Sequence, residues 1–288
     1  MSGWLVTGAG GMLGRDLVAE LTRQGEDVTG LGRGQLDVTD GPAVLAAVRR
    51  HRPEVVVNCA AWTAVDAAEQ QPDAAGRVNG HGARQVAAAC AAHGRRLVQV
   101  STDYVFGGDG SAPYAEDDPP APRTAYGRSK LAGERAVREC LPGASYVVRT
   151  AWLYGAHGGN FVRTMIRLAR ERPFVEVVTD QRGQPTWTAD LVGQIIALVR
   201  AGVTPGIYHA ASSGETTWFG LAREVFTLLG ADPARVRPVG SAALARPAPR
   251  PAYSVLGRER HRYAGVEPIG HWREALHRAF PLLLAAQG

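Results

Sequence analysis

The segment GWLVTGAGGMLGRDL (residues 3–17) joins an apolar run to a glycine-rich turn and then to a helical pattern. Gly8, Gly11 and Gly14 lie three residues apart, in a GxxGxxG arrangement rather than the simpler GxGxxG. Glycines at such a turn allow a sharp reversal, close approach of the backbone to a pyrophosphate, and close packing of helix on strand. The N-terminus of the following helix then faces the anion. This order of strand, turn and helix predicts a dinucleotide-binding βαβ unit.

The same alternation of strand and helix patterns continues along the first half of the chain. Near-continuous apolar runs, which are typical of parallel strands buried on both faces, occur at 3–8, 27–31, 54–59, 96–101 and 146–150. Helical patterns lie between them, at 41–51, at 72–94, and in the stripe formed by Leu13, Leu17 and Leu21. The sequence therefore predicts an α/β fold with a Rossmann-type doubly wound parallel sheet.

The regular alternation weakens after about residue 150. Candidate helices at 158–171, 188–201 and 215–230 are separated by the short strands FVEVV and GIYHA and by a proline-rich stretch at 245–253. We expect a smaller, partly interleaved C-terminal α/β lobe that binds the substrate. Residues 1–150, with about 179–204, are assigned to the dinucleotide-binding domain, and 151–178 with 205–288 to the substrate lobe.

Composition limits the possible partners and location. The chain has 288 residues, a net charge of +5 and 45% hydrophobic residues, and its arginines are scattered rather than gathered into an arm that would bind nucleic acid. The three cysteines are far apart, which predicts free thiols in a reducing compartment. The chain opens directly into a strand pattern, and no apolar run approaches the roughly 18 residues that span a bilayer. We expect a cytoplasmic protein that binds neither nucleic acid nor membrane.

The residues after the second strand bear on the choice of cofactor. An acidic residue about 20 positions beyond the glycine turn would bind the ribose 2′-hydroxyl of NAD. Here the segment TGLGRGQ (29–35) contains Arg33 and no acid. Arg33 is either a solvated loop residue or a partner for the 2′-phosphate of NADP, whose charge suits a guanidinium. NADPH is therefore the expected cofactor, with NADH as the alternative.

Tyr126 and Lys130 are four residues apart in a helical pattern, so they share one face of the helix. A phenol ionises near pH 10, and a neighbouring ammonium would lower its pKa toward useful proton transfer. A YxxxK spacing alone is common and usually marks a surface pair. Together with the glycine turn and the polar strand end STDY (101–104), it predicts protonation of a carbonyl oxygen while a nicotinamide delivers hydride to the carbon.

These motifs resemble a known family. TGxxGxxG and YxxxK are similar to the extended short-chain dehydrogenase/reductases, and further stretches over nearly the whole chain resemble one branch, the dTDP-4-dehydrorhamnose reductases. The stretches are LDVTD (36–40), NCAAWTAVDAAE (58–69), STDYVFGG (101–108), PYAEDDPPAPRTAYGRSKLAGE (113–134), RTAWLYG (149–155), GNFV (159–162), DQRGQPTW (180–187) and PRPAYSVL (249–256).

The resemblance implies roles for individual residues. The catalytic set would be Thr102, Tyr126 and Lys130, with Tyr126 as proton donor, Lys130 on the nicotinamide ribose and Thr102 on the reacting oxygen. The predicted cofactor contacts are Gly8, Gly11, Met12, Leu13 and Gly14 at the pyrophosphate, Arg33, Asp37 and Val38 at the adenosine end, Ala60, Ala61 and Thr63 along the central strand end, and the catalytic Tyr126 and Lys130.

The resemblance also implies the substrate contacts. Thr102, Asp103, Tyr104 and Trp152 would contact the sugar, and Arg250 would pair with the diphosphate. For Trp152 the alternative is ordinary core packing. Asn79 is either a brace for the active-site helix or a plain helix-packing residue.

Some members of this branch dimerise around a magnesium ion held by glutamates. The nearest equivalents here are Asp16 and Asp190, with no convincing third carboxylate. We therefore expect no metal, and either a monomer or a homodimer.

The resemblance implies NAD(P)H-dependent reduction of the 4-keto group of a dTDP-4-dehydro-6-deoxyhexose, foremost dTDP-4-dehydro-β-L-rhamnose to dTDP-β-L-rhamnose. Two alternatives stay open. One is a sister ketoreductase of antibiotic biosynthesis, of the dihydrostreptose type. The other is a non-catalytic nucleotide-binding regulatory subunit, against which the intact proton-donor set argues.

Overall fold

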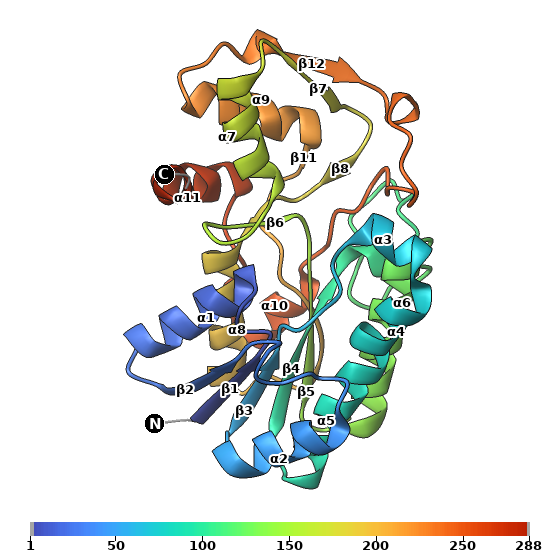
Figure 1. Cartoon of the computed structure of the whole chain (residues 1–288), viewed down its shortest axis with the longest axis vertical. Coiled ribbons are helices and arrows are strands. Elements are labelled where there is room, and N and C mark those ends of the chain that lie inside the picture. Colours follow the sequence, from blue (N-terminus) through green and yellow to red (C-terminus); the bar gives the residue numbers. More distant parts are fainter. Residues whose placement is uncertain (1–2, 287–288) are drawn as a thin grey trace.

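A six-stranded parallel sheet forms the centre of this computed structural model, which describes residues 3–286 (Figure 1). The strand order is β10-β5-β4-β3-β1-β2, and every neighbouring pair is parallel. The strands are β1 (Gly3–Thr7), β2 (Asp27–Leu31), β3 (Val55–Asn58), β4 (Arg96–Thr102), β5 (Ser145–Thr150) and β10 (Gly206–His209). The first five agree with the strands predicted from the sequence.

Helices cover both faces of the sheet because the strands are apolar on both sides. In β1, Trp4 and Val6 pack into one core, whereas Leu5 packs into the other. The first core is covered by α1 (Met12–Arg23) and α8 (Thr188–Arg200). The second is covered by α2 (Gly41–His51), α5 (Ala83–Ala92) and α6 (Ala125–Cys140). The doubly wound arrangement follows from this two-sided burial.

The helical segment predicted for 72–94 is present but is not one regular helix. After α3 (Val65–Gln70), α4 (Pro72–Gly76) continues into the π-helical segment η1 (Arg77–Gly82) and then into α5. At Gly82, a Cβ would lie 2.8 Å from a methyl group of Val38, so the glycine allows this segment to approach the loop after β2. π-helical turns of this kind are frequent at functional sites.

The second lobe lies at the top of Figure 1 and has its own apolar core. Its larger helices carry that core, and short strand pairs border it. The elements are β6 (Leu153–Tyr154), α7 (Phe161–Glu171), β7 (Val175–Val178), β8 (Arg182–Gly183), β9 (Thr186–Trp187), β11 (Thr216–Thr217), α9 (Trp218–Leu228), β12 (Val236–Val239) and α11 (Trp272–Ala285), with 3-10 turns η3 (Pro233–Arg235) and η4 (Ser241–Ala243). Two further elements lie with the main sheet: the 3-10 turn η2 (Asp103–Val105) follows β4, and Ala264 of α10 (Glu259–Ala264) packs against the core that α1 and α8 cover.

One boundary predicted from the sequence is wrong. Residues 205–288 were assigned to the second lobe, but β10 is the edge strand of the main sheet and pairs in parallel with β5. Tyr208 on this strand packs into the same core as α1 and α8, and α8 supplies the crossover that a parallel strand requires. The rest of the domain division stays a prediction.

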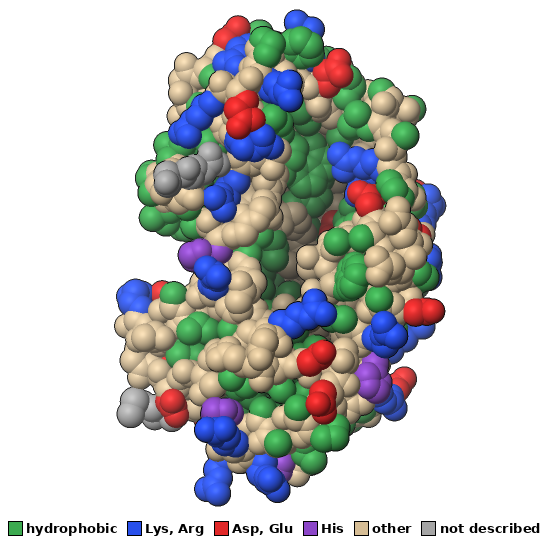
Figure 2. All heavy atoms as spheres, viewed as in Figure 1, with side chains coloured by type: hydrophobic (Ala, Val, Ile, Leu, Met, Phe, Trp, Pro, Cys, Tyr) green, Lys and Arg blue, Asp and Glu red, His purple; other side chains and the backbone are tan. Residues whose placement is uncertain are grey.

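A groove separates the two lobes, and Figure 2 shows it from one side. The carboxyl ends of the parallel strands point toward this groove, which is where open α/β sheets bind ligands. Within residues 3–286, none of the helices is both long and apolar enough to cross a membrane.

Candidate active site

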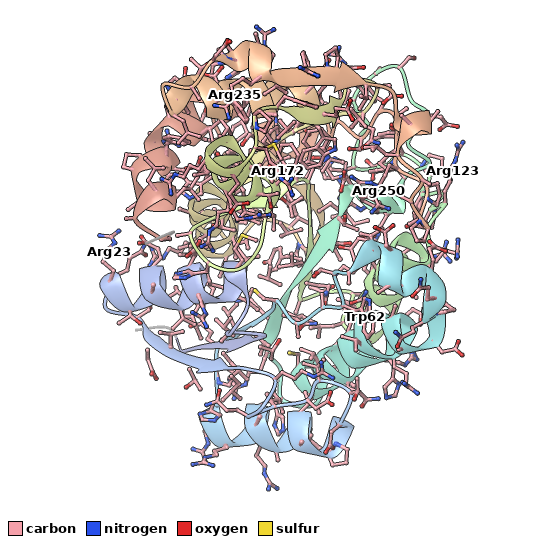
Figure 3. The ribbon with its side chains drawn as sticks, turned by 45° about the horizontal axis from the view of Figure 1, so that its top comes forward. Arg23, Trp62, Arg123, Arg172, Arg235 and Arg250 are labelled. Carbon is pink, nitrogen blue, oxygen red and sulfur yellow. The ribbon has the colours of Figure 1, made fainter. Side chains whose placement is uncertain are left out.

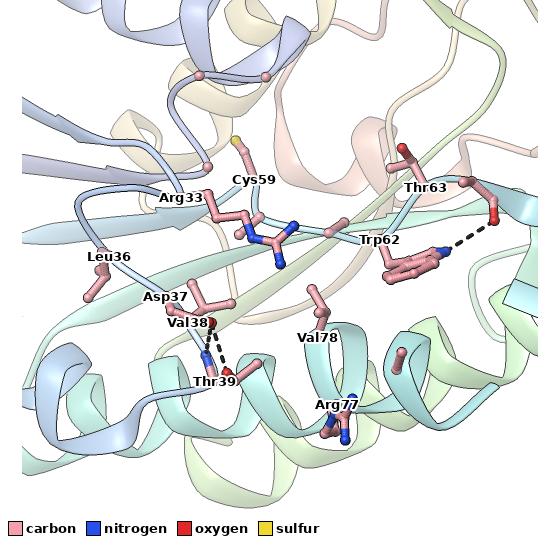
Figure 4. Close-up of a pocket in the computed structure, with 17 residues that line it drawn as sticks. Arg33, Leu36, Asp37, Val38, Thr39, Cys59, Trp62, Thr63, Arg77 and Val78 are labelled. Carbon is pink, nitrogen blue, oxygen red and sulfur yellow. Dashed lines mark hydrogen bonds between the residues drawn. The ribbon is translucent and has the colours of Figure 1, made fainter. Parts of the chain in front are cut away.

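A cavity of about 830 Å³ lies over the glycine turn, at the carboxyl ends of β1, β2 and β3 (Figure 4). It brings together eight of the predicted cofactor residues. They are Gly8, Gly11, Arg33, Asp37, Val38, Ala60, Ala61 and Thr63. The wall also contains residues that the sequence analysis did not assign, among them Leu36, Thr39, Cys59, Trp62, Arg77 and Val78. Four of these lay within stretches that carried the family resemblance: Leu36, Thr39, Cys59 and Trp62.

Two glycines of the turn, Gly8 and Gly14, have no space for a side chain. Gly8 has a φ of +68°, and a Cβ there would lie 2.5 Å from the backbone nitrogen of Ala60. A Cβ on Gly14 would lie 2.5 Å from the carbonyl oxygen of Gly8. Gly11 caps α1 without any side-chain hydrogen bond, so the first N–H groups of this helix stay available to an anion. A dinucleotide pyrophosphate fits this cradle.

Three predicted cofactor residues lie behind the wall of the cavity. Leu13 and Gly14 are buried, and Leu13 packs into the core beneath the sheet. Met12 is turned toward the second lobe, where its sulfur lies 4.0 Å from Nδ2 of Asn160. The side chains of Met12 and Leu13 face away from the cavity and Gly14 has none, so any cofactor contact would come from the backbone of these residues.

At the adenosine end of the cavity, Arg33 extends its guanidinium across the opening (Figure 4). Oδ1 of Asp37 accepts hydrogen bonds from the backbone N–H of Thr39 at 2.9 Å and from its hydroxyl at 2.8 Å. These bonds lower the pKa of Asp37. The carboxylate therefore shapes the loop, while Arg33 supplies positive charge at this end.

Asn79, in the π-helical segment, ties the cavity wall to α6. Its Oδ1 accepts from the backbone N–H of Trp62 at 2.8 Å, and its Nδ2 donates to the carbonyl oxygen of Trp62 at 3.0 Å and to Oγ of Ser129 at 2.9 Å. Ser129 in turn donates to the carbonyl oxygen of Tyr126 at 2.7 Å. Asn79 thus braces the helix that carries Tyr126.

The end of β4 and the start of α6 bring Thr102, Asp103 and Tyr126 together. The Thr102 hydroxyl lies 2.9 Å from Oδ1 of Asp103 and also accepts from the backbone N–H of Tyr104 at 3.2 Å. Burial raises the pKa of Asp103 to about 6, while the hydrogen bond from Thr102 opposes the rise. The rings of Tyr104 and Tyr126 pack edge to face at 5.6 Å.

The pKa of Tyr126 departs from the sequence expectation. Burial raises it to about 12 and the Asp103 carboxylate adds to the rise, whereas a side-chain hydrogen bond with Thr102 opposes it. The Lys130 ammonium donates to the carbonyl oxygen of Val100 at 2.7 Å, and burial lowers its own pKa to about 8. The expected lowering of the Tyr126 pKa is therefore wrong for this structure, in which the phenol is held protonated at neutral pH.

Ser101, the first polar residue of the strand end, belongs to a different network. Its hydroxyl donates to Oε1 of Glu134 at 2.5 Å, and Glu134 pairs with Arg149 at 2.8 Å where both side chains are buried. This ion pair fixes α6 against the ends of β4 and β5. Ser101 is therefore structural, whereas the next residue, Thr102, bonds to Asp103 instead.

Trp152 follows β5, whose last residue, Thr150, is the register partner of Thr102. Its φ of +46° lies in the left-handed region, which costs a bulky residue about 1–3 kcal/mol. The side chain is half-buried and packs against the cores of both the strand end and the second lobe. Because strain of this kind gathers at functional sites, the positive φ favours a functional role for Trp152, and its contact with the sugar stays a prediction.

Arg250 lies on the inner side of the second lobe, near the segment that carries Trp62 (Figure 3). Its Nη2 donates to Oδ2 of Asp66 at 2.7 Å, and Oδ1 of Asp66 accepts from the backbone N–H of Ala248 at 3.1 Å. With Tyr104, Arg250 lines a smaller cavity of about 140 Å³. This ion pair joins the proline-rich loop of the second lobe to the start of α3.

The two carboxylates considered for magnesium have protein partners. Asp16 accepts a hydrogen bond from the Thr188 hydroxyl and lies 3.6 Å from Nε2 of His157. Asp190 accepts two hydrogen bonds from Nη2 of Arg278, at 2.8 and 2.7 Å. Among residues 3–286, no cluster of three or more His, Cys, Asp or Glu side chains could hold a metal ion.

Comparison with known proteins agrees with this geometry. The chain is 61% identical to a dTDP-4-dehydrorhamnose reductase of Streptomyces griseus, over 99% of this chain and 95% of that protein. It is 56% identical to a dTDP-4-keto-6-deoxy-D-glucose reductase of Streptomyces niveus, over 98% of both. A crystal structure of the dTDP-4-dehydrorhamnose reductase of Bacillus anthracis in complex with NADP superimposes with a TM-score of 0.94 at 40% identity, covering 97% of this chain and 99% of that one.

A family model described as the RmlD substrate binding domain matches residues 2–284, which is nearly the whole chain. The match includes both the sheet with its glycine turn and the second lobe. Taken with the identity of 61% to a curated relative, it shows that this chain belongs to the RmlD substrate binding domain family.

Proposed function

We propose that this protein is an NADPH-dependent reductase that converts the 4-keto group of a dTDP-4-dehydro-6-deoxyhexose to an alcohol. The observation that carries the proposal is the meeting of Thr102, Asp103 and Tyr126 at the end of β4, beside a cavity built for a dinucleotide. The names of the two similar relatives and of the NADP-bound structure support the same reaction class.

The chain's own residues suit NADPH. When bound, NADPH supplies the hydride. The glycine cradle and the uncapped N-terminus of α1 would hold the pyrophosphate, and Arg33 would face the 2′-phosphate. Lys130, buried with its ammonium on the carbonyl oxygen of Val100, would hold the nicotinamide ribose. The phosphate-binding charge at Arg33 favours NADPH over NADH.

We assign proton transfer to Tyr126. At neutral pH its raised pKa keeps the phenol protonated, which is the form needed to donate a proton to the oxygen of a carbonyl under reduction. Thr102, hydrogen-bonded to both Tyr126 and Asp103, would position that oxygen. Lys130 would then stabilise the phenolate once the proton has left.

For the sugar nucleotide we assign Asp103, Tyr104 and Trp152 to the hexose ring and Arg250 to the diphosphate. Arg250 would exchange its partner Asp66 for the diphosphate, since an arginine fork binds phosphate as well as carboxylate. The foremost substrate is dTDP-4-dehydro-β-L-rhamnose. The relative named dTDP-4-keto-6-deoxy-D-glucose reductase supports a sister deoxysugar as a second candidate. Free cysteines support a cytoplasmic location.

The test is NADPH oxidation with dTDP-4-keto sugars generated in situ by the upstream enzymes. We expect Tyr126→Phe to lower kcat by at least about 100-fold, because the phenolic proton is lost while the ring stays in place. Tyr146→Phe is the matched control, since its buried hydroxyl donates to the carbonyl oxygen of Val203 on the far side of the sheet, at 3.1 Å. Equally negligible rates for wild type and Tyr126→Phe would contradict the proposal and favour a regulatory subunit, whereas equally high rates would contradict the role of Tyr126 as proton donor.

A further inference from the structure

Trp152 holds a backbone conformation that its own sequence does not favour. Among residues 3–286, Arg52 and Trp152 are the two non-glycine residues with a positive φ. Arg52 only ends α2, whereas Trp152 lies directly beyond the strand end that faces the groove. A bulky residue stays in the left-handed region only when its surroundings over-determine it. The contacts of the indole therefore identify what holds it there.

The indole of Trp152 stacks face to face on that of Trp218. Their ring centroids are 3.5 Å apart and their planes differ by 6°. Gly183 also contacts the Trp152 ring, because a Cβ at that position would lie 2.5 Å from Cε2. The Trp152 carbonyl oxygen accepts from the backbone N–H of Thr186 at 3.2 Å. Ring and backbone are thus both fixed by residues of other segments.

Trp218 is itself anchored in the second lobe. It is the first residue of α9, and the hydroxyl of its preceding residue, Thr217, accepts from the backbone N–H of Gly220 at 3.0 Å. Strand β11, which leads into this helix, pairs antiparallel with β8, so Thr216 lies opposite Gly183. The ring of Phe161, at the start of α7, lies 4.6 Å from that of Trp218. Trp218 is therefore held in place by three segments of the lobe: the β11–α9 junction, β8 and the start of α7.

We propose that Trp218 is a positioning residue that sets the orientation of Trp152 toward the hexose ring, and so the affinity for the sugar half of the substrate. The inference rests on the proposed function, because it takes Trp152 as a sugar contact. Both indoles are half-buried, so their exposed edges are free to border a ligand. An aromatic surface of this kind is better suited to contact the apolar C–H face of a deoxyhexose than to contact a charged group of a ligand.

The test compares dTDP-rhamnose with dTDP, which lacks the sugar, by calorimetry on the full-length protein. Trp218→Leu removes the stack, and we expect the affinity for dTDP-rhamnose to fall about 2- to 10-fold, which corresponds to the energy of an aromatic pair. The affinity for dTDP is expected to stay within about twofold. Turnover should show the same split, with KM for the keto sugar raised more than kcat is lowered.

Two further variants separate positioning from folding. Trp218→Phe keeps an aromatic ring and should restore most of the dTDP-rhamnose affinity. Phe219→Leu alters the next residue, which packs against the same lobe core, and should leave both affinities unchanged. The exciton-coupled circular dichroism of the stacked indoles should disappear in Trp218→Leu and Trp218→Phe but persist in Phe219→Leu.

The outcomes are distinct. The positioning role is overturned if both Trp218→Leu and Trp218→Phe bind dTDP-rhamnose as tightly as wild type does. It is also overturned if Trp218→Leu loses affinity for dTDP to the same extent as for dTDP-rhamnose. In both cases the proposed function stands. If wild type binds neither nucleotide, the proposed function fails, and the inference fails with it.

Discussion

Asp103 shows how far a single residue depends on its surroundings. Its position after an apolar strand, within STDY, was enough to predict a polar group in the groove. The sequence did not indicate that the carboxyl would be 3% exposed, nor that burial would raise its pKa to about 6. For the same reason the Tyr126–Lys130 spacing placed both residues on one helix, α6, but gave the wrong direction for the pKa of Tyr126. Burial and distant charges decide pKa shifts, and both arise only in the folded chain.

The raised pKa of Asp103 makes a prediction about stability. Between about pH 4 and pH 6 the folded protein holds this proton while the unfolded chain releases it. The free energy of unfolding therefore falls as pH rises through that window, and above pH 6 the whole loss of stability caused by the buried charge remains. Asp103→Asn, which cannot ionise, should be more stable than wild type at pH 7.5 by about 1–3 kcal/mol in urea unfolding. The gain should vanish near pH 4. An equal difference at both pH values would show that the carboxylate charge is not the cause.

At the scale of elements, two-sided apolar runs identified five strands of the sheet, because burial on both faces leaves a strong pattern. The sixth, β10, was recognised as a strand but placed in the wrong lobe, since no local pattern states which neighbour a strand pairs with. The π-helical segment η1 was not foreseen. Its sequence reads as ordinary helix, and its geometry is fixed by the close approach of Gly82 to Val38 and by the bonds of Asn79.

The brace at Asn79 gives the second prediction. Asn79→Ala removes the partners of the backbone N–H and carbonyl of Trp62 and of the Ser129 hydroxyl. The free energy of unfolding, measured in urea, should fall by about 2–4 kcal/mol, because buried polar groups lose their hydrogen bonds. The Trp62 amide should exchange its hydrogen faster. Arg84→Ala is the control, since its ion pair with Glu139 is exposed and should be worth under about 1 kcal/mol. Similar stabilities for the two variants would contradict the bracing role.

At the scale of the whole molecule, the proposed mechanism requires residues of two lobes that meet over one strand end. The glycine cradle, Thr102 and Tyr126 belong to the sheet and its helices, whereas Arg250 and the Trp152–Trp218 stack involve the second lobe. The sheet was predictable because its strands and glycine turn leave local patterns, and the proposed site within it was named from motifs of the same local kind. Trp218 and the Asp66–Arg250 pair were not, because each joins segments that are distant in the sequence.

The most direct test of the central claim follows the hydride itself. The protein is incubated with NADPH deuterated at the transferred position of the nicotinamide and with the dTDP-4-keto sugar, and the product is examined by NMR and mass spectrometry. The proposed reaction predicts one deuterium, bound to C4 of the sugar in a single configuration, and its absence when Tyr126→Phe replaces the wild type. Product without deuterium at C4, or deuterium at another carbon of the ring, would contradict direct reduction of the 4-keto group.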